Sequence, residues 1–104
     1  MKVVFDENVP RPLAQYLGGH EVTTVAREGW TGMDNGELVR LVEGRFDVLL
    51  LADKNLRYQQ NLTGRQIALV ELPTNRWPVL QSMADRIRQA VEHAEPGSYT
   101  VLEE

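Results

Sequence analysis

The stretch DVLLLAD, residues 47–53, decides the fold that this chain adopts. Its middle is almost continuously apolar, a composition that is typical of a strand buried on both faces of a sheet. We therefore expect a strand over residues 47–51. Such strands belong to parallel sheets that helices cover on both sides. Asp53 follows the apolar run with no polar spacer, so its carboxylate begins at the edge of the core.

Other segments have the composition of strands or the spacing of helices. Four further short apolar runs predict strands over residues 2–6, 21–25, 67–72 and 99–102. Three segments with helical spacing predict helices from Asn8 to Gly18-Gly19, from Asp34 to Gly44, and from Asn75 to about His93. Residues 54–65 are polar and are expected to form a loop.

Strands that alternate with helices in this way indicate βαβ units. The sequence therefore predicts an α/β fold with three α/β/α layers around a central, mostly parallel sheet, built as one domain over residues 1–104. In such a fold the middle residues of the strands are nearly fully buried. Those residues are Val4, Phe5, Leu49, Leu50 and Val70.

The composition excludes several classes of function. The chain has no cysteine, which removes disulfides, thiolate metal sites and thiol catalysis, and only two histidines. Its net charge of −4 is unlike that of a bulk nucleic-acid binder, although a carboxylate metal site contributes negative charge of its own. The longest apolar run is too short to cross a bilayer, and no signal peptide is visible. We expect a cytoplasmic protein with no membrane partner.

Acidic side chains follow the ends of two predicted strands and begin one helix. Asp6 follows the first strand, Asp53 follows the third, and Glu37 lies in the first turn of the second helix. Ligands of open parallel sheets bind beyond the carboxyl ends of the strands, so these three acids are expected to meet there. Carboxylates held close together repel each other unless a cation joins them. The sequence therefore predicts an Mg²⁺ or Mn²⁺ site that can activate water.

Each candidate also has a purely structural interpretation. Glu37 has the spacing of a capping-box partner for Asp34, which alone explains its presence. An acid after a strand, such as Asp6, is often a solvated loop residue. Asn75 is equally well placed to cap the last helix.

Polar and basic residues near the same edge complete the predicted site. Asn8, Asn55 and Asn75 are candidates for orienting ligands or substrate. The candidates for contacts with nucleic-acid phosphates are Arg11, Lys54, Arg57, Arg65 and Arg76. Scattered surface charge is the alternative explanation for these five cations.

Four motifs in order resemble one known family over nearly the whole chain. They are Val3-Val4-Phe5-Asp6-Glu7-Asn8-Val9-Pro10, Gly18-Gly19-His20-Glu21-Val22, the helix start from Asp34 to Leu38, and Asp53-Lys54-Asn55-Leu56. Together they resemble the small PIN-like domains, which are predicted nucleases related in fold to VapC-type ribonucleases, many of them toxins of toxin–antitoxin pairs.

The resemblance implies a metal-dependent ribonuclease that uses a carboxylate quartet on a parallel sheet. Asp6, Glu37 and Asp53 match three of the four acids. The Thr-x-Asp-x-Asp pattern of PIN domains appears here with Leu51 in place of the threonine and Asn55 in place of the fourth acid. Loss of a charged ligand weakens metal binding, which puts the level of activity in doubt.

Three functions follow as hypotheses. The first is Mg²⁺- or Mn²⁺-dependent cleavage of single-stranded RNA by a toxin that an antitoxin protein holds in check, with a homodimer possible. The second is a PIN-like module that binds RNA or a partner without cleaving, which Asn55 favours. The third is a receiver-like signalling domain, for which Asp6, Glu7, Asp53 and Thr74 have matching positions but no lysine follows the fifth strand.

Overall fold

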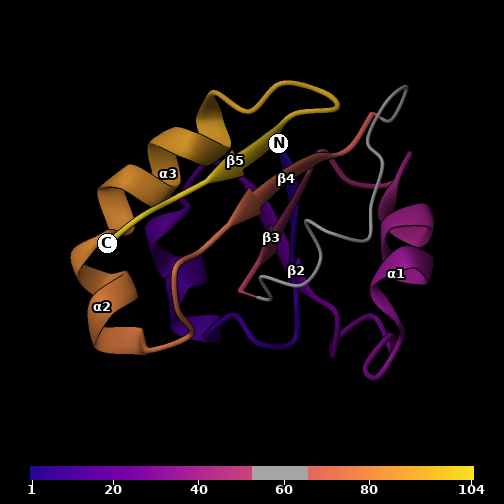
Figure 1. The fold of residues 1–104 in the computed structure, drawn as a ribbon, viewed down its shortest axis with the longest axis horizontal. Helices are drawn as coiled ribbons and strands as arrows, with labels where there is room; N and C mark the ends of the chain where they lie inside the picture. The colour runs from indigo at the N-terminus through magenta and orange to yellow at the C-terminus, as the bar shows by residue number, and fades with distance from the viewer. Residues whose placement is uncertain (53–65) are drawn as a thin grey trace.

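The computed structural model describes residues 1–52 and 66–104, which form one sheet covered by helices (Figure 1). The strands of this described part are β1 (Lys2–Phe5), β2 (Glu21–Thr24), β3 (Val48–Leu51), β4 (Ala68–Glu71) and β5 (Tyr99–Val101). Its helices are the 3₁₀ helix η1 (Arg11–Tyr16), α1 (Asn35–Val42), α2 (Trp77–Ser82) and α3 (Ala84–Glu92). All five expected strands are present, and their ends differ from the expected ones by about one residue.

The strands lie in the order β2-β1-β3-β4-β5, and every neighbouring pair is parallel. The expected parallel sheet is therefore confirmed, with β1 between β2 and β3 rather than at an edge. The chain moves from β1 outward to β2 and then back to β3 on the other side. This reversal makes the junction of β1 and β3 a topological switch point, where open α/β sheets bind their ligands.

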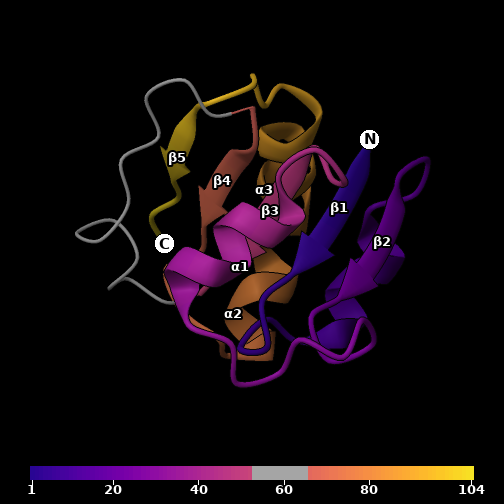
Figure 2. The ribbon, with the colours of Figure 1, turned by 90° about the vertical axis from the view of Figure 1, so that its right-hand side faces the viewer.

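Helices cover both faces of the sheet and give three layers (Figure 2). On one face Val3, Phe5, Leu50 and other apolar side chains pack against η1, α2 and α3. On the other face, called here the α1 face, Val4, Leu49 and their neighbours pack against α1. The expected core is confirmed, because all of its predicted strand residues are fully buried. They are Val4, Phe5, Leu49, Leu50 and Val70.

The first helix differs from the expected one in type and in cap. It is a 3₁₀ helix whose backbone bonds span three residues, such as Leu17 N–H to Ala14 O at 3.1 Å. Asn8 does not cap it, because the N-cap position is Pro10 and no side chain caps the helix there. A turn closed by Val9 N–H donating to Asp6 O at 3.0 Å holds Asn8 outside the helix instead.

The expected long last helix is two helices, α2 and α3, which meet at Met83. The Ser82 hydroxyl donates to Val79 O at 2.6 Å, and Met83 N–H donates to Leu80 O at 3.0 Å, one residue short of the α-helical pattern. A serine that hydrogen-bonds to the backbone competes with the helical ladder in this way. The start is also later than expected, because Arg76 rather than Asn75 occupies the N-cap position.

The middle helix, α1, begins as expected. Asp34 Oδ1 accepts hydrogen bonds from Gly36 N at 2.8 Å and from Glu37 N at 3.1 Å. These bonds satisfy backbone donors that have no partner within the helix. After the C-cap residue Glu43, Gly44 has a φ of 83°, which ends the helix. Because α1 runs back along the sheet from this start, its first turn lies toward the carboxyl ends of the strands.

Candidate functional site

Asp6 occupies the switch point at the carboxyl end of β1. Its backbone N–H donates to Leu50 O at 2.9 Å, so the residue continues the ladder between β1 and β3. The Asp6 side chain is 7% exposed, which makes it one of two buried acidic residues in the described part of the chain. Its Oδ1 accepts a hydrogen bond from Glu7 N at 2.8 Å, and this bond orients the carboxylate.

The other buried acid is Glu71, at the carboxyl end of β4, with 1% exposure. Side chains alternate between the faces of a sheet. Asp6 lies two residues beyond Val4, and Glu71 lies two beyond Leu69, and both of these apolar residues belong to the α1 face. Asp6 and Glu71 therefore share that face at the carboxyl edge.

One strand separates the two buried carboxylates. Leu51 of β3 pairs with Glu71 in the register of the sheet, and Asp6 extends β1 to the level of Leu51 on the other side. Adjacent strands lie about 4.8 Å apart, so the two acidic Cα atoms are roughly 10 Å apart. Glu71 was not predicted as a site residue, although it is the single acid within the otherwise apolar run of residues 67–72.

Tyr99 of β5 holds one oxygen of the Glu71 carboxylate. Its hydroxyl donates to Glu71 Oε1 at 2.9 Å, and Tyr99 pairs with Leu69 in the ladder between β4 and β5. A buried carboxylate is costly unless donors satisfy it. The pair therefore ties β5 to the acidic end of β4.

Replacing Tyr99 by phenylalanine is expected to lower the free energy of unfolding by about 1–3 kcal/mol, because a buried carboxylate loses a donor. Urea unfolding measures the change. The matched control is Tyr16→Phe, which removes a hydroxyl whose 3.2 Å bond to Gln81 Nε2 lies on the surface. Equal losses of unfolding free energy in both variants would show that the buried hydrogen bond stabilises the fold no more than the surface one.

Glu37 is exposed and lies in the first turn of α1. Its backbone N–H is bound by Asp34, as the capping interpretation requires. Its position at the start of α1 is on the same side of the sheet as Asp6 and Glu71. This bond is the Asp34 half of a capping box, and a role of the Glu37 carboxylate at the carboxyl edge stays a prediction.

The third predicted acid, Asp53, lies outside the described residues, as do Lys54, Asn55, Arg57 and Arg65. Within residues 1–52 and 66–104, no three His, Asp or Glu side chains come close enough together to hold a metal ion. The described chain thus provides Asp6, a buried hard-oxygen donor of the kind that Mg²⁺ and Mn²⁺ prefer. Asp6 supplies one donor of this kind, and the joint site of Asp6, Glu37 and Asp53 stays a prediction.

The remaining predicted residues lie on the surface. Asn8 and Asn75 are exposed. Arg76 is also exposed, and its backbone N–H donates to Thr74 Oγ1 at 3.2 Å in the turn after β4. All three follow the carboxyl ends of strands and so stay available for the roles proposed for them.

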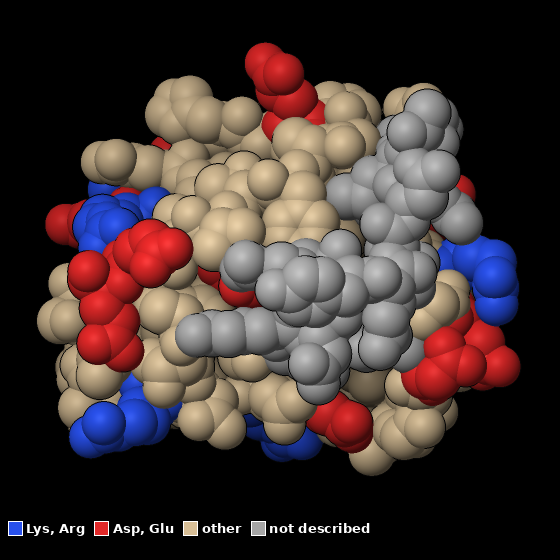
Figure 3. Space-filling model, in the orientation of Figure 1, with Lys and Arg blue, Asp and Glu red and all other residues tan. Residues whose placement is uncertain are grey.

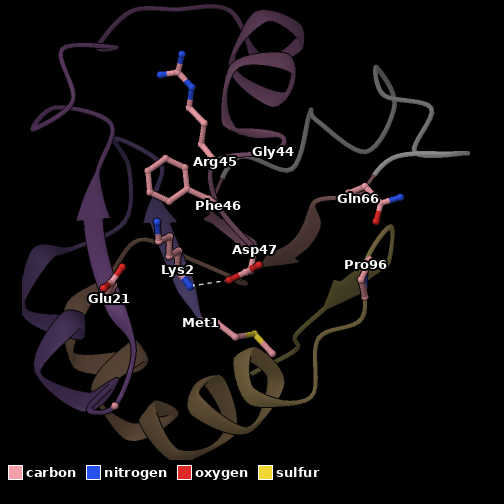
Figure 4. A pocket seen from close by; sticks show the side chains of 10 residues that line it. Met1, Lys2, Glu21, Gly44, Arg45, Phe46, Asp47, Gln66 and Pro96 are labelled. Atoms are coloured by element: carbon pink, nitrogen blue, oxygen red, sulfur yellow. Dashed lines mark hydrogen bonds between the residues drawn. The ribbon is translucent and has the colours of Figure 1, made fainter.

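A pocket of about 670 Å³ lies at the opposite, amino edge of the sheet (Figure 4). Lys2 and Arg45 line it together with Glu21 and Asp47, so its charges are mixed. Asp47 Oδ2 is already engaged, since it accepts the Lys2 backbone N–H at 2.8 Å. Nothing in this pocket connects it to the acids at the carboxyl edge, and it carries no part of the site.

Charge on the face drawn in Figure 3 is interleaved. Blue Lys and Arg side chains and red Asp and Glu side chains lie in small neighbouring groups around its rim, where grey atoms do not cover it. This face shows no extended field of one sign. An anionic substrate that binds this acidic chain therefore needs a local cluster of cations.

No protein-family model, no curated protein and no solved structure matches this chain. Within the described segments, no helix reaches the length and apolar character that crossing a bilayer requires.

Proposed function

We propose that this protein is an Mg²⁺- or Mn²⁺-dependent endoribonuclease of PIN-like type that cleaves single-stranded RNA in the cytoplasm and has an antitoxin protein as its partner. The observation that carries the proposal is Asp6, a buried carboxylate at the switch point of a parallel sheet. Ligand sites of such sheets lie at this position. Its carboxylate offers the hard oxygen atoms that Mg²⁺ and Mn²⁺ prefer as ligands.

In the proposed reaction, each candidate residue would have its own role. Asp6, oriented by the Glu7 N–H, would hold the ion with Asp53, and Glu37 would complete the ligands or orient the attacking water. The bound ion would supply a Lewis acid for the phosphoryl oxygen and a water of lowered pKa. The low dielectric around Asp6 would strengthen its attraction for the cation. Asn8, Asn55 and Asn75 would orient ligands or substrate.

Cleavage of single-stranded RNA in Mg²⁺ or Mn²⁺, and none in EDTA, is the expected result for the purified protein. Saturating metal should also raise the melting temperature, because an ion at 100 times its dissociation constant stabilises the folded state by about 2.7 kcal/mol. Matched single-stranded DNA and duplex RNA serve as comparison substrates. Cleavage that persists in EDTA, or no cleavage with any metal, would contradict the proposal.

One structural observation favours a second candidate. The strand order is that of flavodoxin-like proteins, which include the receiver CheY. Against it, the residues after β5 are Leu102-Glu103-Glu104, with no lysine to contact a phosphoryl group. Incubation with acetyl phosphate separates the two: a phosphorylated Asp53 would favour the receiver, and an unmodified protein favours the nuclease.

A further inference from the structure

A groove of about 460 Å³ lies between η1 and the edge strand β2. Arg11 and Arg27 line it, together with small side chains such as Ala14, Val22 and Thr24. We call it the β2 groove. No aromatic side chain lines it, so it has neither a platform for stacking bases nor a deep apolar pocket for an anchoring side chain.

The charge of the β2 groove differs from that of the pockets at the amino edge and beside α2 and α3. Its lining contains two arginines and no carboxylate. The pocket at the amino edge is lined by Asp47 as well as Arg45, and the pocket beside α2 and α3 is lined by Glu104 as well as Arg86. In a chain of net charge −4, two unopposed guanidinium groups select for an anion.

Both arginines are available to a ligand. Across residues 1–52 and 66–104, neither Arg11 nor Arg27 forms an ion pair, whereas Arg88 contacts Asp85 at 3.6 Å. Both are exposed. A guanidinium binds phosphate through two parallel hydrogen bonds, which suits it to a phosphodiester.

The open edge of β2 adds backbone donors to the β2 groove. Glu21 N–H and Val25 N–H donate to β1, at 3.0 Å to Met1 O and 2.9 Å to Phe5 O. In a parallel ladder the residues between them direct their N–H groups the other way. The N–H groups of Val22 and Thr24 therefore point outward from the sheet, where β2 is the terminal strand (Figure 2).

The β2 groove adjoins the proposed site. Arg11 follows β1 and Arg27 follows β2, so both come from the carboxyl edge where Asp6 lies. Phe5, which precedes Asp6, pairs with Thr24 of the groove. The groove opens on the η1 side of the sheet and Asp6 faces the α1 side, so a strand bound in the groove would cross the end of β1 to reach Asp6.

We infer that the β2 groove binds the phosphate backbone of single-stranded RNA through Arg11 and Arg27 and leads the strand over the end of β1 to Asp6. This inference rests on the proposed ribonuclease function. RNA is favoured over an acidic peptide because the groove adjoins the proposed site and has no apolar anchor pocket. Without an aromatic platform, recognition in the groove is independent of base identity.

Binding of fluorescein-labelled oligouridine, measured by anisotropy over a range of salt concentrations in EDTA, tests the inference without cleavage. Arg11→Gln and Arg27→Gln should each weaken binding by roughly 5-fold and reduce the slope of log K against log salt by about 0.7. Arg45→Gln is the matched control, since this exposed arginine lies in the pocket at the amino edge, and it should bind like wild type. Arg27→Lys, which keeps the charge, should recover much of the slope.

The outcomes separate the β2 groove from the nuclease. If both glutamine variants bind oligouridine with wild-type affinity and slope, or if wild type does not bind it, the inference is overturned, whatever the protein cleaves. If they lose affinity for polyglutamate but not for oligouridine, the groove is a protein-docking site and the inference is again overturned. If they lose oligouridine binding while wild type cleaves no RNA, the groove is supported and the nuclease proposal fails.

Discussion

Asp6→Asn is expected to reduce metal-dependent RNA cleavage by on the order of a thousandfold or more, because it removes a charged ligand from the ion that activates water. The fold should survive, since asparagine has nearly the same shape and its Oδ1 can still accept the Glu7 N–H. The variant should also lose the rise in melting temperature that metal gives to wild type. Initial rates with labelled RNA, and thermal unfolding with and without metal, measure the two effects.

Glu7→Gln provides the matched control for that experiment. Glu7 is the next residue in the chain and also an acid, but it is exposed, and its Oε2 accepts a long bond of 3.4 Å from Gly32 N. It should retain most of the activity and the metal response. Equal losses in Asp6→Asn and Glu7→Gln would show that general surface charge, rather than the carboxylate at the switch point, drives the reaction.

Phe5→Ala should have the largest effect on stability, about 3–5 kcal/mol, because it leaves a cavity beneath the end of β1. Phe5 is fully buried and packs in the core that η1, α2 and α3 cover. Each kcal/mol shifts the melting temperature of a domain of this size by roughly 4–8 °C. Urea denaturation gives the free energy of unfolding directly.

The control for Phe5→Ala is Val101→Ala, at a strand residue that is 38% exposed and should change stability by less than about 0.5 kcal/mol. Phe5 and Asp6 are neighbours in sequence but face opposite sides of the sheet. We therefore expect Phe5→Ala to lower stability and Asp6→Asn to lower the rate of RNA cleavage while leaving the fold intact. If Phe5→Ala unfolded at the wild-type temperature, the packing of this core would be misjudged.

Much of the fold could be predicted from the sequence, because strands that are buried on both faces of a sheet have almost continuously apolar sequences. The runs around Val4 and Leu49 have no polar interruption, and that composition is typical of strands in a covered parallel sheet. The cap at Asp34 was equally visible. What local pattern could not show was competition within a segment, such as the Ser82 hydroxyl that bonds to Val79 O where the last helix divides.

The candidate site was only partly accessible to the same reasoning. Strand ends placed Asp6 at the carboxyl edge, which the structure bears out, because that edge follows from topology alone. Glu71 was missed because its segment was treated as uniformly apolar, and its burial depends on Tyr99, which is distant in sequence. Arg11 was predicted as a phosphate contact, but the β2 groove was missed because Arg27 belongs to a different connection and only the pairing of β1 with β2 brings the two arginines together.

The parallel sheet has a kinetic consequence for a chain leaving the ribosome. β1 is an inner strand, and its pairing of Val3 with Val48 cannot form until β3 has been synthesised. Until then the most apolar part of the amino terminus has only β2 as a partner, and pairings so distant in sequence close slowly. With synthesis at about 5–20 residues per second, the Val-Val-Phe segment waits for several seconds in a form prone to aggregation.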